Sequence, residues 1–186
     1  MKQIFEFFIA NLLLIVLFIP ILIIIFIIKF ETSGPAIYWS KRVGKNNKIY
    51  LMPKFRTMKV DSPDVATHLL KNPDIYITNI GKLLRRFSLD EIPQLYSIII
   101  GDMSFVGPRP ALYNQYDLIN LRNIKNINHL KPGITGWAQI NGRDSISIEL
   151  KVELDYFYMI NKNTFLDIKI IFLTLYKAIR NENILH

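Results

Sequence analysis

The chain has 186 residues, 51% of them hydrophobic, and its 23 lysines and arginines outnumber 15 acidic residues to give a formal net charge of +8. This apolar and aromatic content excludes an intrinsically disordered chain, and the absence of cysteine excludes a disulfide scaffold, thiol catalysis and thiolate-bound metal. The three histidines lack the spacing of a zinc site, and the length fits one modest domain with an appended segment.

The hydrophobic excess is concentrated in residues 4–28, where the residues outside the apolar set are Glu6, Asn11 and Pro20. A helix of this length would be about 37 Å long, more than the ~30 Å hydrocarbon core of a bilayer. Because Pro20 lacks a backbone donor, we expect a kink or break there. Physics alone leaves two geometries open: a kinked spanning helix, or a helix–break–helix hairpin in one leaflet. The sequence therefore predicts a membrane anchor over residues 1–30 and a water-soluble domain over residues 31–186.

Positive charges flank this segment unequally, since Lys2 alone precedes it and the following region carries Lys29, Lys41, Arg42, Lys45 and Lys48. The positive-inside tendency places the globular part in the cytoplasm. Its basic charge suits anionic lipid headgroups or phosphorylated substrates. Nucleic acid is not expected as a partner, because the basic residues are mixed with carboxylates and no nucleic-acid-binding signature is present.

The rest of the chain predicts an α+β fold that is mostly helical, with one small β-hairpin. A turn at Ser33-Gly34-Pro35 precedes two runs rich in β-branched and aromatic residues, which predict hairpin strands over Ala36–Val43 and Lys48–Phe55. Residues 61–80 are polar and predict a loop with a short helix. Helices are predicted over Gly81–Phe87, Ser88–Ile100, Leu112–Ile127, Ile148–Ile160 and Thr164–Arg180. Residues 107–110 and 131–142, which contain proline and glycine, are predicted as loops.

The last predicted helix is apolar around most of its circumference. Its polar residues follow one stripe, made by Asp167, Thr174, Lys177 and Asn181. Such a helix packs into the core or lies in the plane of a membrane interface.

The densest group of reactive side chains is the run Arg85-Arg86-Phe87-Ser88-Leu89-Asp90-Glu91-Ile92-Pro93-Gln94. In a structural interpretation, Ser88 and Glu91 form a capping box at the start of a helix and Asp90 complements the helix dipole. In a functional interpretation, the same helix start attracts phosphate and keeps Asp90 ionised for attack on phosphorus. The adjacent carboxylates also suit a Mg²⁺ ion shared with a pyrophosphate substrate. The two interpretations compete at Glu91, because a capping glutamate is not available as a base.

Further basic residues lie in rigid or glycine-containing segments, which suits bidentate phosphate contacts. These segments are Lys54-Phe55-Arg56-Thr57-Met58, Gly107-Pro108-Arg109-Pro110 and Asn141-Gly142-Arg143. For each of them the alternative is an ordinary solvated charge. The two prolines around Arg109 favour a function there, whereas both interpretations stay open for Arg56 and Arg143.

Five collinear motifs together resemble the bacterial sugar transferases, also called monotopic phosphoglycosyl transferases. The motifs are Ser33-Gly34-Pro35, Lys54-Phe55-Arg56-Thr57-Met58, the run from Arg85 to Gln94, Gly101-Asp102-Met103-Ser104-Phe105-Val106-Gly107-Pro108-Arg109-Pro110, and the run from Lys131 to Arg143. The resemblance extends from the membrane segment to Arg180, and the chain is similar in size to the minimal catalytic members of the family.

The resemblance implies transfer of a sugar-1-phosphate from a UDP-sugar to polyprenyl (undecaprenyl) phosphate, with release of UMP, as the first membrane step of surface polysaccharide or glycan assembly. It implies that Asp90 forms a covalent phosphosugar intermediate, that Glu91 assists, and that Mg²⁺ is the cofactor, with Asp90 as a candidate ligand. The residues that match the family's phosphate-binding or nucleotide-binding positions are Arg109 and Arg143, with Lys54, Arg56 and Arg86 as further candidates.

The resemblance also implies a re-entrant anchor broken at a Ser-Pro pair, in the bacterial inner (cytoplasmic) membrane with the catalytic domain on the cytoplasmic face. Here the pair is Ile19-Pro20, so the backbone effect of proline is kept and the serine hydroxyl is lost. Two alternatives stay open: a catalytically idle membrane-bound scaffold, and a membrane phosphatase or pyrophosphatase that uses the same carboxylates. The sequence discloses neither the sugar nor the oligomeric state.

Overall fold

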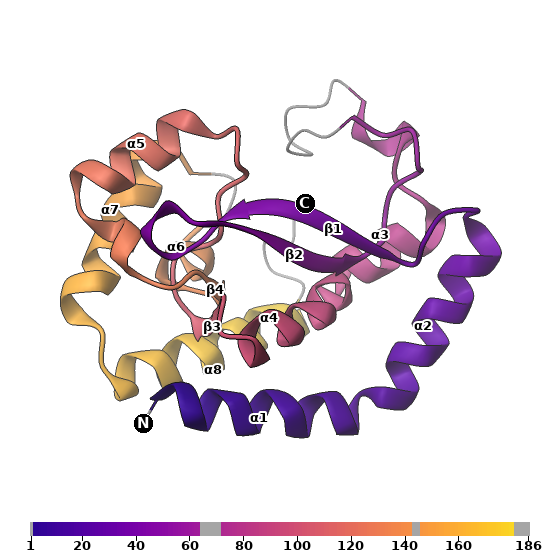
Figure 1. Ribbon diagram of the computed structural model, residues 1–186, viewed down its shortest axis with the longest axis horizontal. Coiled ribbons are helices and arrows are strands. Elements are labelled where there is room, and N and C mark those ends of the chain that lie inside the picture. The colour runs from indigo at the N-terminus through magenta and orange to yellow at the C-terminus, as the bar shows by residue number, and fades with distance from the viewer. Residues whose placement is uncertain (1, 64–71, 143–145, 181–186) are drawn as a thin grey trace.

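The computed structural model describes residues 2–63, 72–142 and 146–180 (Figure 1). The fold is α+β and mostly helical with small sheets, as predicted. The elements are α1 (Lys2–Val16), α2 (Phe18–Glu31), β1 (Ile37–Val43), β2 (Ile49–Phe55), α3 (Asn79–Arg86), α4 (Leu95–Ile99), β3 (Ser104–Val106), α5 (Tyr116–Ile124), β4 (Gly133–Thr135), α6 (Trp137–Ile140), α7 (Ile148–Asn161) and α8 (Thr164–Arg180). Short 3₁₀ turns lie at Lys45–Asn47, Pro73–Ile75, Leu89–Gln94 and Ile127–His129.

The apolar N-terminal segment forms two helices that meet at Leu17 with a bend of 61°. The predicted break is confirmed, and it lies a few residues before Pro20. Pro20 has no N–H for the carbonyl of Val16, and its ring presses on that carbonyl, so the first helix ends at Val16. Helical bonding continues beyond the break with Ile21 N donating to Leu17 O at 2.9 Å. Among the described residues no single helix is long and apolar enough to cross a membrane, and this bent pair meets that requirement only as a unit.

One side of the helix pair packs on the rest of the protein. Ala10 of α1 lies in a core cluster with Leu95 and Ile98 of α4, and Ile28 of α2 lies in another with Leu84 of α3. The other side exposes large apolar side chains, among them Ile4, Phe5, Phe8, Leu12, Ile15, Phe18, Ile19, Ile23, Phe26 and Phe30. Figure 1 shows the two helices, in indigo and purple, along the outer edge of the molecule.

Both ends of the helix pair are tied to the globular body. At the start of α1, Lys2 Nζ lies 2.7 Å from Asp167 Oδ2 of α8. At the end of α2, Glu31 accepts hydrogen bonds from the backbone N–H groups of Asn79 at 2.7 Å and Ile80 at 2.9 Å. The pair is therefore attached to the globular body at both ends as well as along its packed side.

The predicted hairpin is confirmed, with β1 and β2 paired antiparallel in a register that sets Arg42 opposite Tyr50 and Tyr38 opposite Lys54. Because strand side chains alternate, Arg42, Tyr50 and Lys54 share one face of the hairpin. This face contacts α4 and the Leu89–Gln94 turn, so it places Lys54 over the Asp90–Glu91 pair.

Three predicted boundaries are corrected. The helix expected over Ser88–Ile100 begins as the 3₁₀ turn Leu89–Gln94 and becomes α-helical only in α4, after Pro93. The helix expected over Leu112–Ile127 is the shorter α5, because Leu112 forms a β-bridge with Arg42. The loop expected over residues 131–142 contains α6 and also β4, which pairs in parallel with β3.

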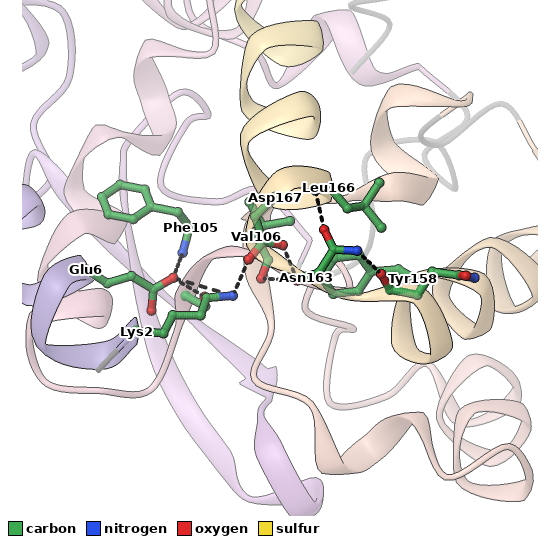
Figure 2. A network of polar contacts seen from close by, with 10 residues as sticks. Lys2, Glu6, Phe105, Val106, Tyr158, Asn163, Leu166 and Asp167 are labelled. Carbon is green, nitrogen blue, oxygen red and sulfur yellow. Dashed lines mark hydrogen bonds and ion pairs between the residues drawn. The ribbon is translucent and has the colours of Figure 1, made fainter.

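The helix α8 was predicted over the same range, and its polar stripe faces inward. Thr174 Oγ1 lies 2.6 Å from Thr135 Oγ1, and Lys177 donates to the carbonyl of Ile140 at 2.6 Å. Asp167 accepts from Lys2 and from Tyr158, as Figure 2 shows. The side chains exposed on the outer face are apolar or aromatic and include Phe165, Ile168, Phe172, Leu175 and Tyr176. The helix packs into the core and also presents an apolar surface, while Asn181 lies outside the described residues.

Candidate active site

The two candidate carboxylates lie in the 3₁₀ turn Leu89–Gln94, and both are buried, with Asp90 4% and Glu91 6% exposed. Ser88, which precedes the turn, has a left-handed backbone with φ of 54° and makes no side-chain cap hydrogen bond. The predicted capping box is therefore wrong. The side chain of Glu91 contacts Lys54 and Arg109 instead.

Two of the predicted basic residues meet at this pair. Lys54 Nζ of β2 lies 2.9 Å from Glu91 Oε1 and 3.6 Å from Asp90 Oδ2. Arg109, from the loop after β3, places its NH1 atom 3.2 Å from the same Glu91 oxygen. The site thus joins residues from three segments that are far apart in the sequence.

The other oxygen of the Asp90 carboxyl group, Oδ1, is buried and has no hydrogen-bond partner among the described residues. Burial raises the pKa of Asp90, and the charge of Glu91 raises it further, while Lys54, Arg85 and Arg109 act in the opposite direction. A buried polar oxygen without a partner destabilises the folded protein, and such atoms are found where a ligand or reaction uses them. The oxygen has the chemistry needed to attack phosphorus or to bind a cation.

Of the two neighbouring arginines, Arg85, rather than the predicted Arg86, acts electrostatically on the Asp90 carboxyl group. Its Nε atom donates to Thr57 Oγ1 at 2.9 Å, and its charge opposes the rise in the pKa of Asp90. Arg86 is exposed, with its guanidinium 5.6 Å from the ring centroid of Phe87. Helical spacing was an available signal, because Arg85 lies one turn after the buried Gly81.

The two remaining candidates do not join this cluster in the described contacts. Arg56 donates to the carbonyl of Pro35 at 2.7 Å and lies 5.9 Å from the ring centroid of Tyr38. Arg143 lies outside the described residues.

Arg42 is a residue of this region that the sequence motifs did not single out. Its NH1 atom donates to the carbonyl of Pro110 at 3.1 Å, and burial, together with the charge of Arg109, lowers its pKa to about 10. The signal was present in the hairpin register, since strand alternation puts Arg42 on the same face as Lys54.

The carboxylates of Asp90 and Glu91 are the candidate ligands for a magnesium ion at this site. Among residues 2–63, 72–142 and 146–180, no group of three or more acidic, histidine or cysteine side chains gathers to hold a metal. Mg²⁺ is commonly bound by one or two carboxylates together with substrate phosphates. Asp90 and Glu91, with the unpartnered Asp90 oxygen, fit an ion of that kind.

Comparison with known proteins shows the family to which the chain is similar. A family model described as "Bacterial sugar transferase" matches residues 1–181. The chain is 40% identical over 184 residues to "Uncharacterized sugar transferase EpsL" of Bacillus subtilis, covering 99% of this chain and 90% of that protein. It is 39% identical over 179 residues to the Escherichia coli "UDP-glucose:undecaprenyl-phosphate glucose-1-phosphate transferase", covering 91% of this chain and 38% of that one.

A third relative is the Aeromonas hydrophila "UDP-N-acetylgalactosamine-undecaprenyl-phosphate N-acetylgalactosaminephosphotransferase", which is 35% identical over 156 residues. The match covers 80% of this chain and 36% of that protein. The chain therefore spans most of the Bacillus protein but well under half of the two relatives whose names state a reaction.

Proposed function

The chain belongs to the bacterial sugar transferase family, and on this basis we propose that it transfers a sugar-1-phosphate from a UDP-sugar to undecaprenyl phosphate and releases UMP. The names of two relatives describe this class of reaction. The observation that carries the proposal is the buried Asp90–Glu91 pair. Within the described part of the chain Asp90 Oδ1 has no hydrogen-bond partner, while Asp90 Oδ2 lies near Lys54 and Glu91 Oε1 contacts both Lys54 and Arg109.

The first half-reaction in this proposal is attack by the Asp90 carboxylate on the phosphorus that carries the sugar. A new bond forms between an Asp90 oxygen and this phosphorus, the bond to the UMP oxygen breaks, and UMP leaves with the electron pair. Lys54 and Arg109 lie where they can stabilise negative charge on the diphosphate. The product is a covalent aspartyl phosphosugar.

In the second half-reaction an oxygen of undecaprenyl phosphate attacks the same phosphorus. The bond to Asp90 breaks, the carboxylate is regenerated, and an undecaprenyl diphosphate sugar leaves. Glu91 assists this step by activating the acceptor phosphate. Mg²⁺ held by Asp90, with Glu91 beside it, would neutralise charge on the diphosphate when bound.

The acceptor is a lipid, so the site must lie at a membrane. We assign the bent pair of α1 and α2 as a re-entrant anchor in the inner membrane, with the catalytic domain on the cytoplasmic face. Two features support it: an apolar outer side, and ends that both contact the globular body through Lys2 and Glu31. A segment whose two ends meet one body cannot leave them on opposite sides of a bilayer.

Labelling of an introduced cysteine tests the anchor. The chain has no cysteine, so one placed before Lys2 is unique. It should stay protected from an impermeant thiol reagent outside intact cells. Labelling from outside would show a spanning helix instead.

The reaction itself is tested by incubating purified protein with UDP-sugars, Mg²⁺ and undecaprenyl phosphate. We expect UMP release that depends on undecaprenyl phosphate. Turnover to free sugar phosphate without the lipid would identify a phosphatase or pyrophosphatase. Absence of UMP with every UDP-sugar would leave an idle scaffold.

A further inference from the structure

The loop that carries Arg109 is held by an unbroken series of hydrogen bonds. Four consecutive carbonyls, those of residues 108–111, each accept a bond, and the donors come from β1, α5 and β4. The donors are Gly133 N to Pro108 O at 2.9 Å, Arg122 NH1 to Arg109 O at 2.9 Å, Arg42 NH1 to Pro110 O at 3.1 Å, and Val43 N to Ala111 O at 3.0 Å. Two of the four donors are arginine side chains, those of Arg42 and Arg122.

The side chains of this loop are buried on both sides of Arg109. In residues 106–112, Arg109 is the partly exposed residue and its neighbours are buried. Its guanidinium meets Glu91, which joins the loop to the carboxylate pair. The backbone bonds therefore decide where this one guanidinium lies.

Arg122 is itself held in place by a buried acid. Arg122 of α5 is 8% exposed and Asp155 of α7 is 1% exposed. The Nε and NH2 atoms of Arg122 donate to Asp155 Oδ2 at 3.0 and 2.6 Å, which leaves NH1 to reach the Arg109 carbonyl. A buried ion pair of this kind is often no more stable than a hydrophobic pair of similar volume. Stability alone does not explain why these charges lie here.

We propose that Arg122 is a positioning residue, held by Asp155, that fixes the Arg109 loop so that the Arg109 guanidinium meets the diphosphate of the substrate. This inference rests on the proposed function for the identity of the substrate. Arg42 of the hairpin donates to the next carbonyl of the loop, that of Pro110. The loop is therefore hydrogen-bonded to the hairpin on one side and to α5 on the other. Neither Arg122 nor Asp155 touches the Asp90–Glu91 pair in the described contacts, and both act through the backbone of the loop.

The decisive variant replaces both charges with apolar side chains, Arg122→Met together with Asp155→Leu. Because both charges are removed together, the protein should still fold, and its thermal midpoint should fall only by the effect of the one hydrogen bond lost at the Arg109 carbonyl. The carbonyl of Arg109 loses its donor, so amide hydrogen exchange between residues 105 and 112 should become faster. The value of kcat/KM for the UDP-sugar should fall about 100-fold, the loss expected when a binding group is misplaced by about 1 Å.

A matched control uses a second ion pair near the same helices, between Lys125, the C-terminal cap of α5, and Glu153 of α7, which lies at the surface with its atoms 2.5 Å apart. Lys125→Gln with Glu153→Gln should leave the exchange rates and kcat/KM of the wild type. If the Arg122→Met, Asp155→Leu protein instead keeps wild-type exchange in the loop and wild-type kcat/KM, the pair is only structural and the proposal is overturned.

A second variant covers the case in which the double variant does not fold. Arg122→Lys keeps a charge for Asp155 but loses the fork that serves two acceptors at once. It should fold and show fast exchange in the loop with reduced kcat/KM, and wild-type values for both would overturn the proposal. Hydrogen exchange measured without substrate separates the positioning role of Arg122 from the proposed transferase function. It reports on the order of the Arg109 loop even if the wild type releases no UMP.

Discussion

At the scale of single residues, the environment that stabilises the neutral form of the buried Asp90 carboxyl group opposes the charged form that the proposed reaction needs. Burial and the neighbouring Glu91 raise its pKa, so the folded protein disfavours the charge that attack on phosphorus requires. Lys54, Arg85 and Arg109 reduce this penalty without removing it. Such groups are typical of sites where stability is lowered for function.

Asp90→Asn should abolish covalent labelling by a radiolabelled UDP-sugar and should also make the protein more stable at neutral pH. Because the pKa of Asp90 is raised on folding, wild-type stability falls as pH rises from the ordinary aspartate pKa through the raised one. The increase in the free energy of unfolding caused by Asp90→Asn is therefore complete above the raised pKa of Asp90, and it disappears at low pH. Thermal unfolding across pH measures it, with exposed Asp117→Asn as the control. Persistent labelling would rule out Asp90 as the nucleophile.

The pH dependence of labelling by the wild type follows from the same shift. The attacking form is the carboxylate, so the labelling rate should fall as pH drops through the raised pKa of Asp90. This decline should begin at a higher pH than an ordinary aspartate would give. Initial rates of label incorporation against pH check it, and a rate that stays constant down to the ordinary aspartate range would contradict it.

The neighbouring arginines Arg85 and Arg86 offer a matched comparison. Arg85→Leu removes the charge near Asp90 and the bond to Thr57, so activity should fall by about tenfold or more. Arg86→Leu changes an exposed side chain and should have a small effect. UMP release by the two variants measures the difference, and equal losses would show that the structure assigns the wrong arginine. The motif alone contains both arginines and could not distinguish them, because the distinction depends on which side of α3 faces Thr57.

At the scale of elements, a buried acid within the apolar helix α1 binds that helix to β3. Glu6 Oε1 accepts from Ser104 Oγ and, at 3.2 Å, from the backbone N–H of Phe105 (Figure 2). The hydroxyl of Tyr158 in α7, which donates to Asp167, also lies 3.2 Å from the carbonyl oxygen of Val106 in the same strand. The short strand is thus held by α1 and α7 together.

Glu6→Ala should lower the free energy of unfolding by about 2 to 6 kcal/mol, since it leaves the buried Ser104 hydroxyl and the part-buried Phe105 N–H without an acceptor at roughly 1–3 kcal/mol each. Glu6→Gln keeps an acceptor oxygen at the same place and should lose much less. Denaturant unfolding in detergent compares the two variants with the wild type. Equal losses would mean that the charge near Lys2, and not the acceptor, is what stabilises α1.

Elements with local signals were predictable, and the parallel pair was not. The hairpin, α3, α7 and α8 follow from periodicity and turn residues within each segment. Strands β3 and β4 have three residues each and lie far apart in sequence, so no local pattern marks them. Their pairing depends on close backbone approach, because a Cβ on Gly133 would lie 2.1 Å from Gly107 N. A glycine in the sequence indicates that another group approaches the backbone closely, but it does not identify that group.

At the scale of the whole molecule, apolar side chains are exposed on the outer sides of α1, α2 and α8. On α8, Phe165 is 79% exposed and Phe172 is 70% exposed. Phe165→Ser with Phe172→Ser should therefore reduce binding to lipid vesicles and leave the thermal midpoint nearly unchanged. Vesicle flotation and thermal unfolding measure the two effects. The opposite pattern, unchanged flotation with a lowered midpoint, would place α8 in the protein core alone.

In the re-entrant arrangement that we propose, the bend at Leu17 also affects the lipid. A hairpin that entered and left through the cytoplasmic leaflet would add area to that leaflet and none to the other one. The unequal areas favour a surface curved toward the protein, and loosely packed, strongly curved bilayers should accept such a wedge most readily. The enzyme would then gather on small vesicles in preference to large ones, and its own density would alter the shape of the membrane in which it works.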